Sequence, residues 1–267
     1  MQIGSASSVQ NYATEHGLTV PDYGRSYWPV FMLVVRTGLF LAWQALVAGI
    51  FALRQHPHPW QASVAWWPIS AILTNVICFG LLRFLAQREG LPFWKELIHA
   101  DFRREHLRKD LLALLGLVLL CGPVGMLPNL GLGLLLFGDA QTPSAMFLQP
   151  LPAAVALVAL ILFPITQAFG ELPTYFAYAM PRLAARWSSP WKAIVVAAFW
   201  LGAQHAALPF IPDLRFILWR LGMFLPFALL LGWAMHWRPR LLPYFMVIHA
   251  LIDFPVTLMV WQASVGK

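Results

Sequence analysis

Four residues in the C-terminal part of the sequence have side chains that can move protons or bind a metal ion: Glu171, His205, His249 and Asp253. They lie in three apolar segments, and a rise of about 1.5 Å per residue would place them roughly 12–21 Å from the same membrane face. His249 and Asp253 are four residues apart, so they share one face of a helix. A charge at mid-depth of a bilayer costs about 2.5–3.5 kcal/mol and needs a partner or a water-filled cavity. The shared depth therefore predicts one buried catalytic or metal site.

This set of residues fits both metal-dependent and metal-free chemistry. A divalent metal such as zinc would take its ligands from Glu171, His205, His249 and Asp253 and keep one position open for water. Without a metal, Glu171 would be the general base, and His205 or the His249–Asp253 pair would stabilise an oxyanion. Each residue also has a purely structural interpretation, as a packing histidine, a carboxylate that orients a histidine, or a Glu–His pair that joins helices. Neither HExxH nor GxSxG occurs in the sequence, so neither a zincin nor a serine-elbow site is indicated.

The residues around Glu171 predict a broken helix. Gly170 precedes the carboxylate and Pro173 follows it closely, within the stretch FPITQAFGELPTYFAYAMPRL. Pro173 has no N–H to donate to the preceding helical turn, and Gly170 tolerates an irregular backbone. A free carbonyl at membrane depth is tolerated only where protein or cavity water satisfies it. We therefore expect the break, the carboxylate and a small wet cavity to lie together.

Composition indicates an integral membrane protein. Of 267 residues, 60% are hydrophobic and only 11% are charged, against about 25% charged in soluble domains. The mean hydropathy is +0.67 and the net charge is +7. Cytoplasmic loops rich in Lys and Arg explain such a charge without nucleic acid as a partner. The expected partners are membrane lipid and a membrane-associated peptide or protein substrate.

The hydrophobic segments predict an all-α polytopic membrane helix bundle with about seven transmembrane helices. Residues 1–27 form a polar N-terminal tail, residues 28–267 form a single membrane domain, and residues 93–112 are expected to form a cytoplasmic interfacial helix. With the N-terminus in the cytoplasm, most Lys and Arg residues fall in inside loops, which predicts that orientation and a bacterial inner membrane. This assignment puts Arg220 in an outside segment and leaves Arg36 within the first span. The expected spans are residues 28–53, 64–86, 110–132, 152–182, 191–209, 216–236 and 241–263.

Three short motifs in the region of residues 160–256 resemble those of the CPBP intramembrane protease family, also called the CAAX-protease or Abi family. The family's motifs are EExxxR, usually within a string such as EELLFRGYLLPRL, then FxxxH on the next helix, and HxxxN or HxxxD on the last helix. The matching stretches here, in the same order, are ELPTYFAYAMPRL from Glu171 to Leu183, LGAQH from Leu201 to His205, and HALID from His249 to Asp253.

The resemblance implies a helical intramembrane endopeptidase. Glu171 would activate water with His205 as its partner, and His249 and Asp253 would bind the oxyanion or a metal. The sequence departs from the motifs at three positions, where the second Glu, the Arg and the aromatic residue are replaced by Leu172, Phe176 and Leu201. Two alternatives stay open: a non-catalytic membrane binding or immunity protein of the same fold, and a proton-linked transporter.

Overall fold

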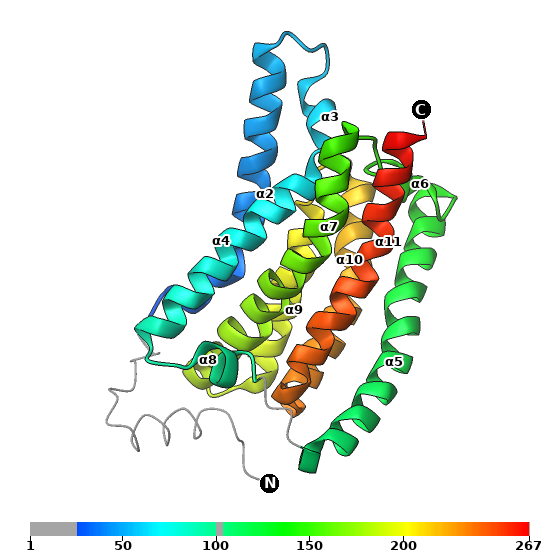
Figure 1. Ribbon diagram of the computed structural model, residues 1–267. Helices are drawn as coiled ribbons and strands as arrows, with labels where there is room; N and C mark the ends of the chain where they lie inside the picture. The colour runs from blue at the N-terminus through cyan, green and yellow to red at the C-terminus, as the bar shows by residue number, and fades with distance from the viewer. Residues whose placement is uncertain (1–25, 100–103, 267) are drawn as a thin grey trace.

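The computed structural model describes residues 26–99 and 104–266, and within them the protein consists of helices joined by loops, with no strands (Figure 1). The predicted polar tail lies almost wholly outside the described residues. In chain order the elements are α2 (Trp28–Leu53), α3 (Pro59–Val64), α4 (Trp67–Arg88), the π-helical η1 (Phe93–Leu97), α5 (Arg104–Phe137), α6 (Thr142–Ala145), α7 (Ala153–Gly170), the π-helical η2 (Pro173–Ala179), α8 (Met180–Trp187), α9 (Pro190–Ala206), α10 (Leu214–Trp237), the 3₁₀ turn η3 (Pro239–Leu241) and α11 (Leu242–Val265).

Within the described residues, six stretches of helix are long and apolar enough to cross a membrane, which supports an integral membrane protein. They comprise α2, α4, most of α5, the run from α7 to α8, α10, and η3 with α11. The predicted span 191–209 corresponds to α9, which has only 17 residues and lies at the short end of what a bilayer requires. The count of seven therefore stays a prediction. The predicted third span, residues 110–132, lies within α5, which continues through Pro123 and Pro128 to Phe137.

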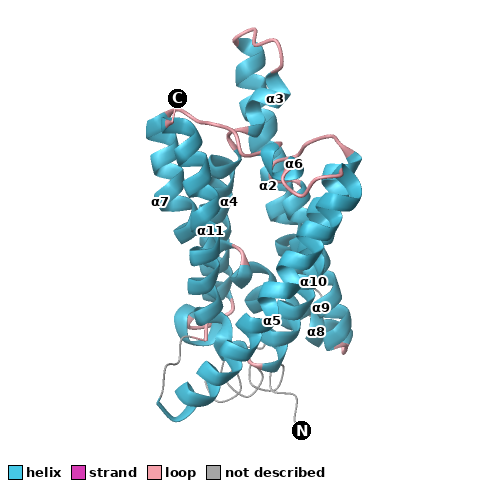
Figure 2. Ribbon diagram, turned by 90° about the vertical axis from the view of Figure 1, so that its right-hand side faces the viewer, coloured by secondary structure: helices cyan, strands magenta, loops and turns pink. Residues whose placement is uncertain are grey.

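The long helices form two packed groups that α2 joins. In one group α4 and α11 pack on α7, and in the other α5 and α9 pack on α10. Figure 2 shows the two groups on opposite sides of the bundle, with α2 between them. Because α2 packs on both α4 and α9, side chains on its inner face can reach residues of both groups.

The predicted break after α7 is confirmed. The helix ends at Gly170, Glu171 occupies the C-cap, and the chain continues as η2 from Pro173. The Thr174 hydroxyl donates to the Gly170 carbonyl at 2.6 Å, so protein satisfies that polar group at membrane depth. Gly170 also has a packing role, since a Cβ there would lie 2.9 Å from the Cα of Asn75. The absence of a side chain lets α4 approach α7 closely at this level.

The predicted interfacial helix over residues 93–112 is wrong as a single element. The π-helical turn η1 ends at Leu97, His99 has a left-handed φ of 57°, and α5 begins only at Arg104. Residues 100–103 lie outside the described residues. Phe93, Leu97 and Ile98 are buried in the core, so these three apolar side chains pack into the bundle, whereas Trp94 stays exposed.

Candidate active site

The four residues singled out in the sequence meet inside the bundle. Glu171 follows α7, His205 lies in the last turn of α9, and His249 and Asp253 lie on α11. His205 Nε2 is 3.8 Å from Glu171 Oε2, and His249 Nε2 is 3.5 Å from Glu171 Oε1. His249 Nε2 also lies 3.3 Å from Asp253 Oδ2. The site therefore joins the two helix groups, with the carboxylate between two imidazoles.

Exposure increases steadily across the site towards α11. The exposed fraction of the side chain is 3% at Glu171, 11% at His205, 16% at His249 and 18% at Asp253. The carboxylate thus forms the floor of the site, and the α11 residues form its more accessible side.

Three polar residues that the sequence interpretation did not assign to the site surround Glu171. The amide nitrogens of Gln167 and Gln204 donate to Glu171 Oε2 at 2.5 and 2.6 Å, and Arg36 Nη2 lies 3.6 Å from the same oxygen. Arg36 is fully buried. The rule that intramembrane charges need partners would have pointed to Arg36, whereas no local signal distinguishes the two glutamines from other polar residues.

His205 is held at three points. Its Nδ1 lies 2.7 Å from the Leu201 carbonyl, which only accepts hydrogen bonds, so Nδ1 carries the proton and Nε2 faces Glu171. The imidazole stacks on the Phe224 ring at 3.5 Å between centroids. Arg220 donates to the His205 and Leu208 carbonyls at 3.0 and 2.7 Å. The assignment of Arg220 to an outside segment is therefore wrong: it is buried within α10, where it satisfies carbonyls at the end of α9.

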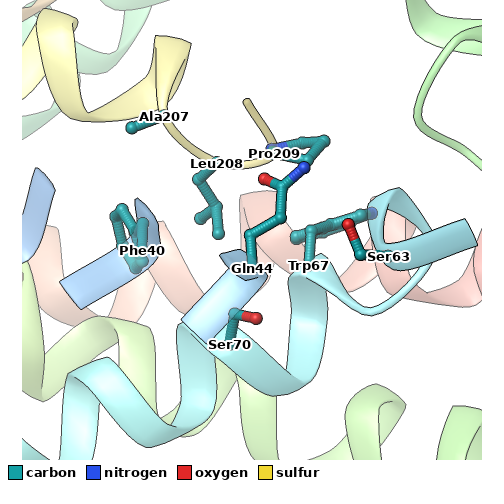
Figure 3. A pocket seen from close by; sticks show the side chains of 8 residues that line it. All are labelled: Phe40, Gln44, Ser63, Trp67, Ser70, Ala207, Leu208 and Pro209. Atoms are coloured by element: carbon teal, nitrogen blue, oxygen red, sulfur yellow. The ribbon is translucent and has the colours of Figure 1, made fainter. Parts of the chain in front are cut away.

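The loop after α9 is fastened to α2 beside a narrow hollow (Figure 3). Gln44 donates to the Phe210 carbonyl at 2.9 Å and accepts from the Phe210 N–H at 2.7 Å, so it pairs with the backbone of the loop that follows His205. None of the four predicted site residues lines the hollow. Its link to the site is indirect, because Gln44 in its wall holds the loop that follows His205. The hollow is lined by Phe40, Gln44, Ser63, Trp67, Ser70, Ala207, Leu208 and Pro209.

Some polar atoms of the site are left without hydrogen-bond partners. His249 Nδ1 and Asp253 Oδ2 are buried and accept or donate no hydrogen bond within the described structure, and the same holds for the Tyr175 hydroxyl. Asp253 Oδ2 is near His249 Nε2 but does not form a hydrogen bond with it. Unsatisfied buried polar atoms are costly and commonly mark functional sites. These atoms are suited to bind water or a polar reactant.

The arrangement does not fit a resident divalent metal. Among the described residues, no group of three or more His, Cys, Asp and Glu side chains could hold a metal ion. Glu171 Oε2 already accepts from two amides, and the Arg36 guanidinium lies beside it. A guanidinium at that distance would repel a metal cation bound to the same carboxylate. Metal ligation by Glu171, His205, His249 and Asp253 thus finds no support in this geometry.

The motif departures are accommodated by apolar packing. Leu172 and Phe176, which replace the motif's second Glu and its Arg, are both 3% exposed. The Phe176 ring packs against Gly232, where a Cβ would lie only 3.1 Å from Phe176 Cε1. Replacement of a buried ion pair by packed apolar residues is often neutral for stability.

Comparisons with protein-family models, curated proteins and solved structures found no match.

Proposed function

We propose that the protein is an intramembrane endopeptidase, similar to CPBP proteases, that hydrolyses a peptide bond in or near the membrane. The observation that carries this proposal is the convergence of Glu171 with His205, His249 and Asp253 from three separate segments. A carboxylate between imidazoles supplies a base and a hydrogen-bond donor in a site with restricted access to solvent, which is what peptide hydrolysis requires.

In the proposed reaction, Glu171 Oε1 accepts a proton from a water molecule, whose oxygen attacks the scissile carbonyl carbon. The imidazole of His249 donates to the resulting oxyanion through Nε2, and the Asp253 carboxylate beside that nitrogen adds an electrostatic attraction without a hydrogen bond. When the carbon–nitrogen bond breaks, the proton on Glu171 passes to the leaving amine. His205 is the less suitable donor, since its Nδ1 proton is committed to the Leu201 carbonyl. Its Nε2 can then only accept, so we assign it to holding the attacking water beside Glu171.

We further propose that α9 is a seventh span and that the N-terminus lies in the cytoplasm of a bacterial inner membrane. The Lys and Arg residues concentrate in the segments that this orientation places inside, and α9 packs on α10, which is long enough to span a membrane. The substrate would be a membrane-associated peptide or protein.

The test is cleavage of a transmembrane peptide by the purified protein in liposomes. Glu171→Gln and His249→Ala should each lower the rate by about 10²–10⁴, the usual contribution of a general acid or base. Asp139→Asn and His56→Ala are matched controls in exposed loops and should cleave at the wild-type rate. Cleavage by Glu171→Gln at the wild-type rate would refute the proposal and favour a non-catalytic membrane protein of the same fold.

A further inference from the structure

We propose that Arg36 is a positioning residue for Glu171 and that it acts through the amides of Gln167 and Gln204. The proposal rests on the function proposed above and identifies what orients its base. The motif would supply an arginine at position 176, where this chain has a phenylalanine. The only guanidinium recorded within ion-pair distance of Glu171 in the described structure belongs to Arg36, on the first long helix.

Both glutamines bridge the arginine and the glutamate in the same sense. Arg36 Nε donates to Gln204 Oε1 at 2.6 Å, and Arg36 Nη2 donates to Gln167 Oε1 at 3.3 Å. The amide nitrogen of each glutamine then donates to Glu171 Oε2. The guanidinium of Arg36 thus faces the amide oxygens, and the carboxylate of Glu171 faces the amide nitrogens. The two charges therefore fix the orientation of each side-chain amide, with its oxygen towards Arg36 and its nitrogen towards Glu171.

The clamp formed by Arg36, Gln167 and Gln204 leaves one carboxylate oxygen available for chemistry. Glu171 Oε2 accepts two short hydrogen bonds, which occupy its two lone pairs. Glu171 Oε1 has only His249 Nε2 within ion-pair distance in the described structure. The clamp therefore selects Oε1 as the oxygen that faces the accessible side of the site.

Arg36 is itself anchored so that it can hold this geometry. Its Nη1 donates to Asn75 Oδ1 at 2.9 Å, and Asn75 in turn donates to Thr166 Oγ1 at 3.2 Å. The guanidinium also lies over the Phe40 ring at 5.3 Å. These contacts use the fork geometry of arginine, which a lysine ammonium cannot reproduce. A role limited to charge balance would not need that geometry, so the two roles can be separated.

The first test measures catalysis by Arg36→Lys, Gln167→Met and Gln204→Met, with Gln149→Met as a control away from the site. We expect kcat to fall about 10²-fold in Arg36→Lys, the usual cost of a small misplacement of a catalytic group. KM should stay within about twofold because Arg36 has no exposed surface for substrate. The glutamine variants should show smaller losses of kcat, and the control none. Wild-type kcat in Arg36→Lys would overturn the positioning role.

The second test is independent of activity. The melting temperatures of Arg36→Lys, Gln204→Met and the double variant form a cycle, and the double variant should lose less than the sum of the two single losses, because each substitution breaks the same bridge. Additive losses would refute the clamp. If the wild-type protein cleaves no peptide while the cycle shows coupling, the proposed endopeptidase activity fails and the clamp stands.

Discussion

Gly170→Ala should destabilise the protein, although alanine is the better helix former. A Cβ at this position would lie 2.9 Å from the Cα, Cβ and Oδ1 atoms of Asn75, closer than van der Waals contact permits. Because Cα belongs to the backbone, no rotation of a side chain relieves the overlap, and α4 must move away from α7. Asn75 Oδ1 accepts from Arg36 Nη1 at 2.9 Å, so the same movement would also loosen the site.

The magnitude follows from comparable overpacking, which costs about 1–3 kcal/mol. The gain in helix propensity from Gly to Ala is at most about 1 kcal/mol and is smaller here, because Gly170 is the last residue of α7. At roughly 2–4 °C per kcal/mol, the melting temperature should fall by about 2–12 °C. Gly80→Ala on α4 is the matched control, since a Cβ there meets no atom within 4 Å.

Thermal unfolding of the purified variants in one detergent, followed by circular dichroism, measures both effects. Gly80→Ala should melt at or slightly above the wild-type temperature, and Gly170→Ala below it. If Gly170→Ala melts as high as Gly80→Ala, the two helices do not approach each other closely at Asn75.

Three further predictions concern a helix cap, an ion pair and the ring that stacks on His205. Asp213→Ala should cost about 0.5–2 kcal/mol in the stability of α10, since Asp213 caps this helix. The hydrogen bond from the Arg215 side chain lowers the pKa of Asp213, so the stabilisation by its carboxylate is complete above about pH 4 and is lost as the pH falls through the folded pKa. Melting curves that show equal acid sensitivity for the wild type and Asp213→Asn would contradict this. Arg182→Met should destabilise the protein by at most about 3–5 kcal/mol, since the partly buried Glu89 loses its cation and keeps the Tyr178 hydroxyl as a donor. Adding Glu89→Gln should restore part of the melting temperature, and no recovery would argue against the ion pair. Phe224→Leu should remove a ring stack of about 0.5–1.5 kcal/mol from the α9 histidine and lower the cleavage rate, and an unchanged rate would show that the stack does not orient the imidazole.

Local features of the sequence were sufficient to predict a helical membrane bundle and to single out the four residues that converge at the candidate site. Long apolar segments specify helices because a bilayer leaves backbone groups no other partners. Glu171, His205, His249 and Asp253 stood out because polar groups at that depth are costly unless they face one another. The break at Pro173 was predictable for a similarly local reason, the missing N–H of proline.

Only the tertiary structure decided how the carboxylate is held. The Arg36–Gln204 hydrogen bond joins residues 168 positions apart, and nothing in either neighbourhood indicates that α2 packs against α9 at that level. The same limit explains the two errors: Arg220 caps a helix end instead of lying in a loop, and the segment from Phe93 buries Phe93, Leu97 and Ile98 in the core. Hydropathy and spacing report the preferences of one segment, whereas the partners of a buried polar group depend on which helices come together.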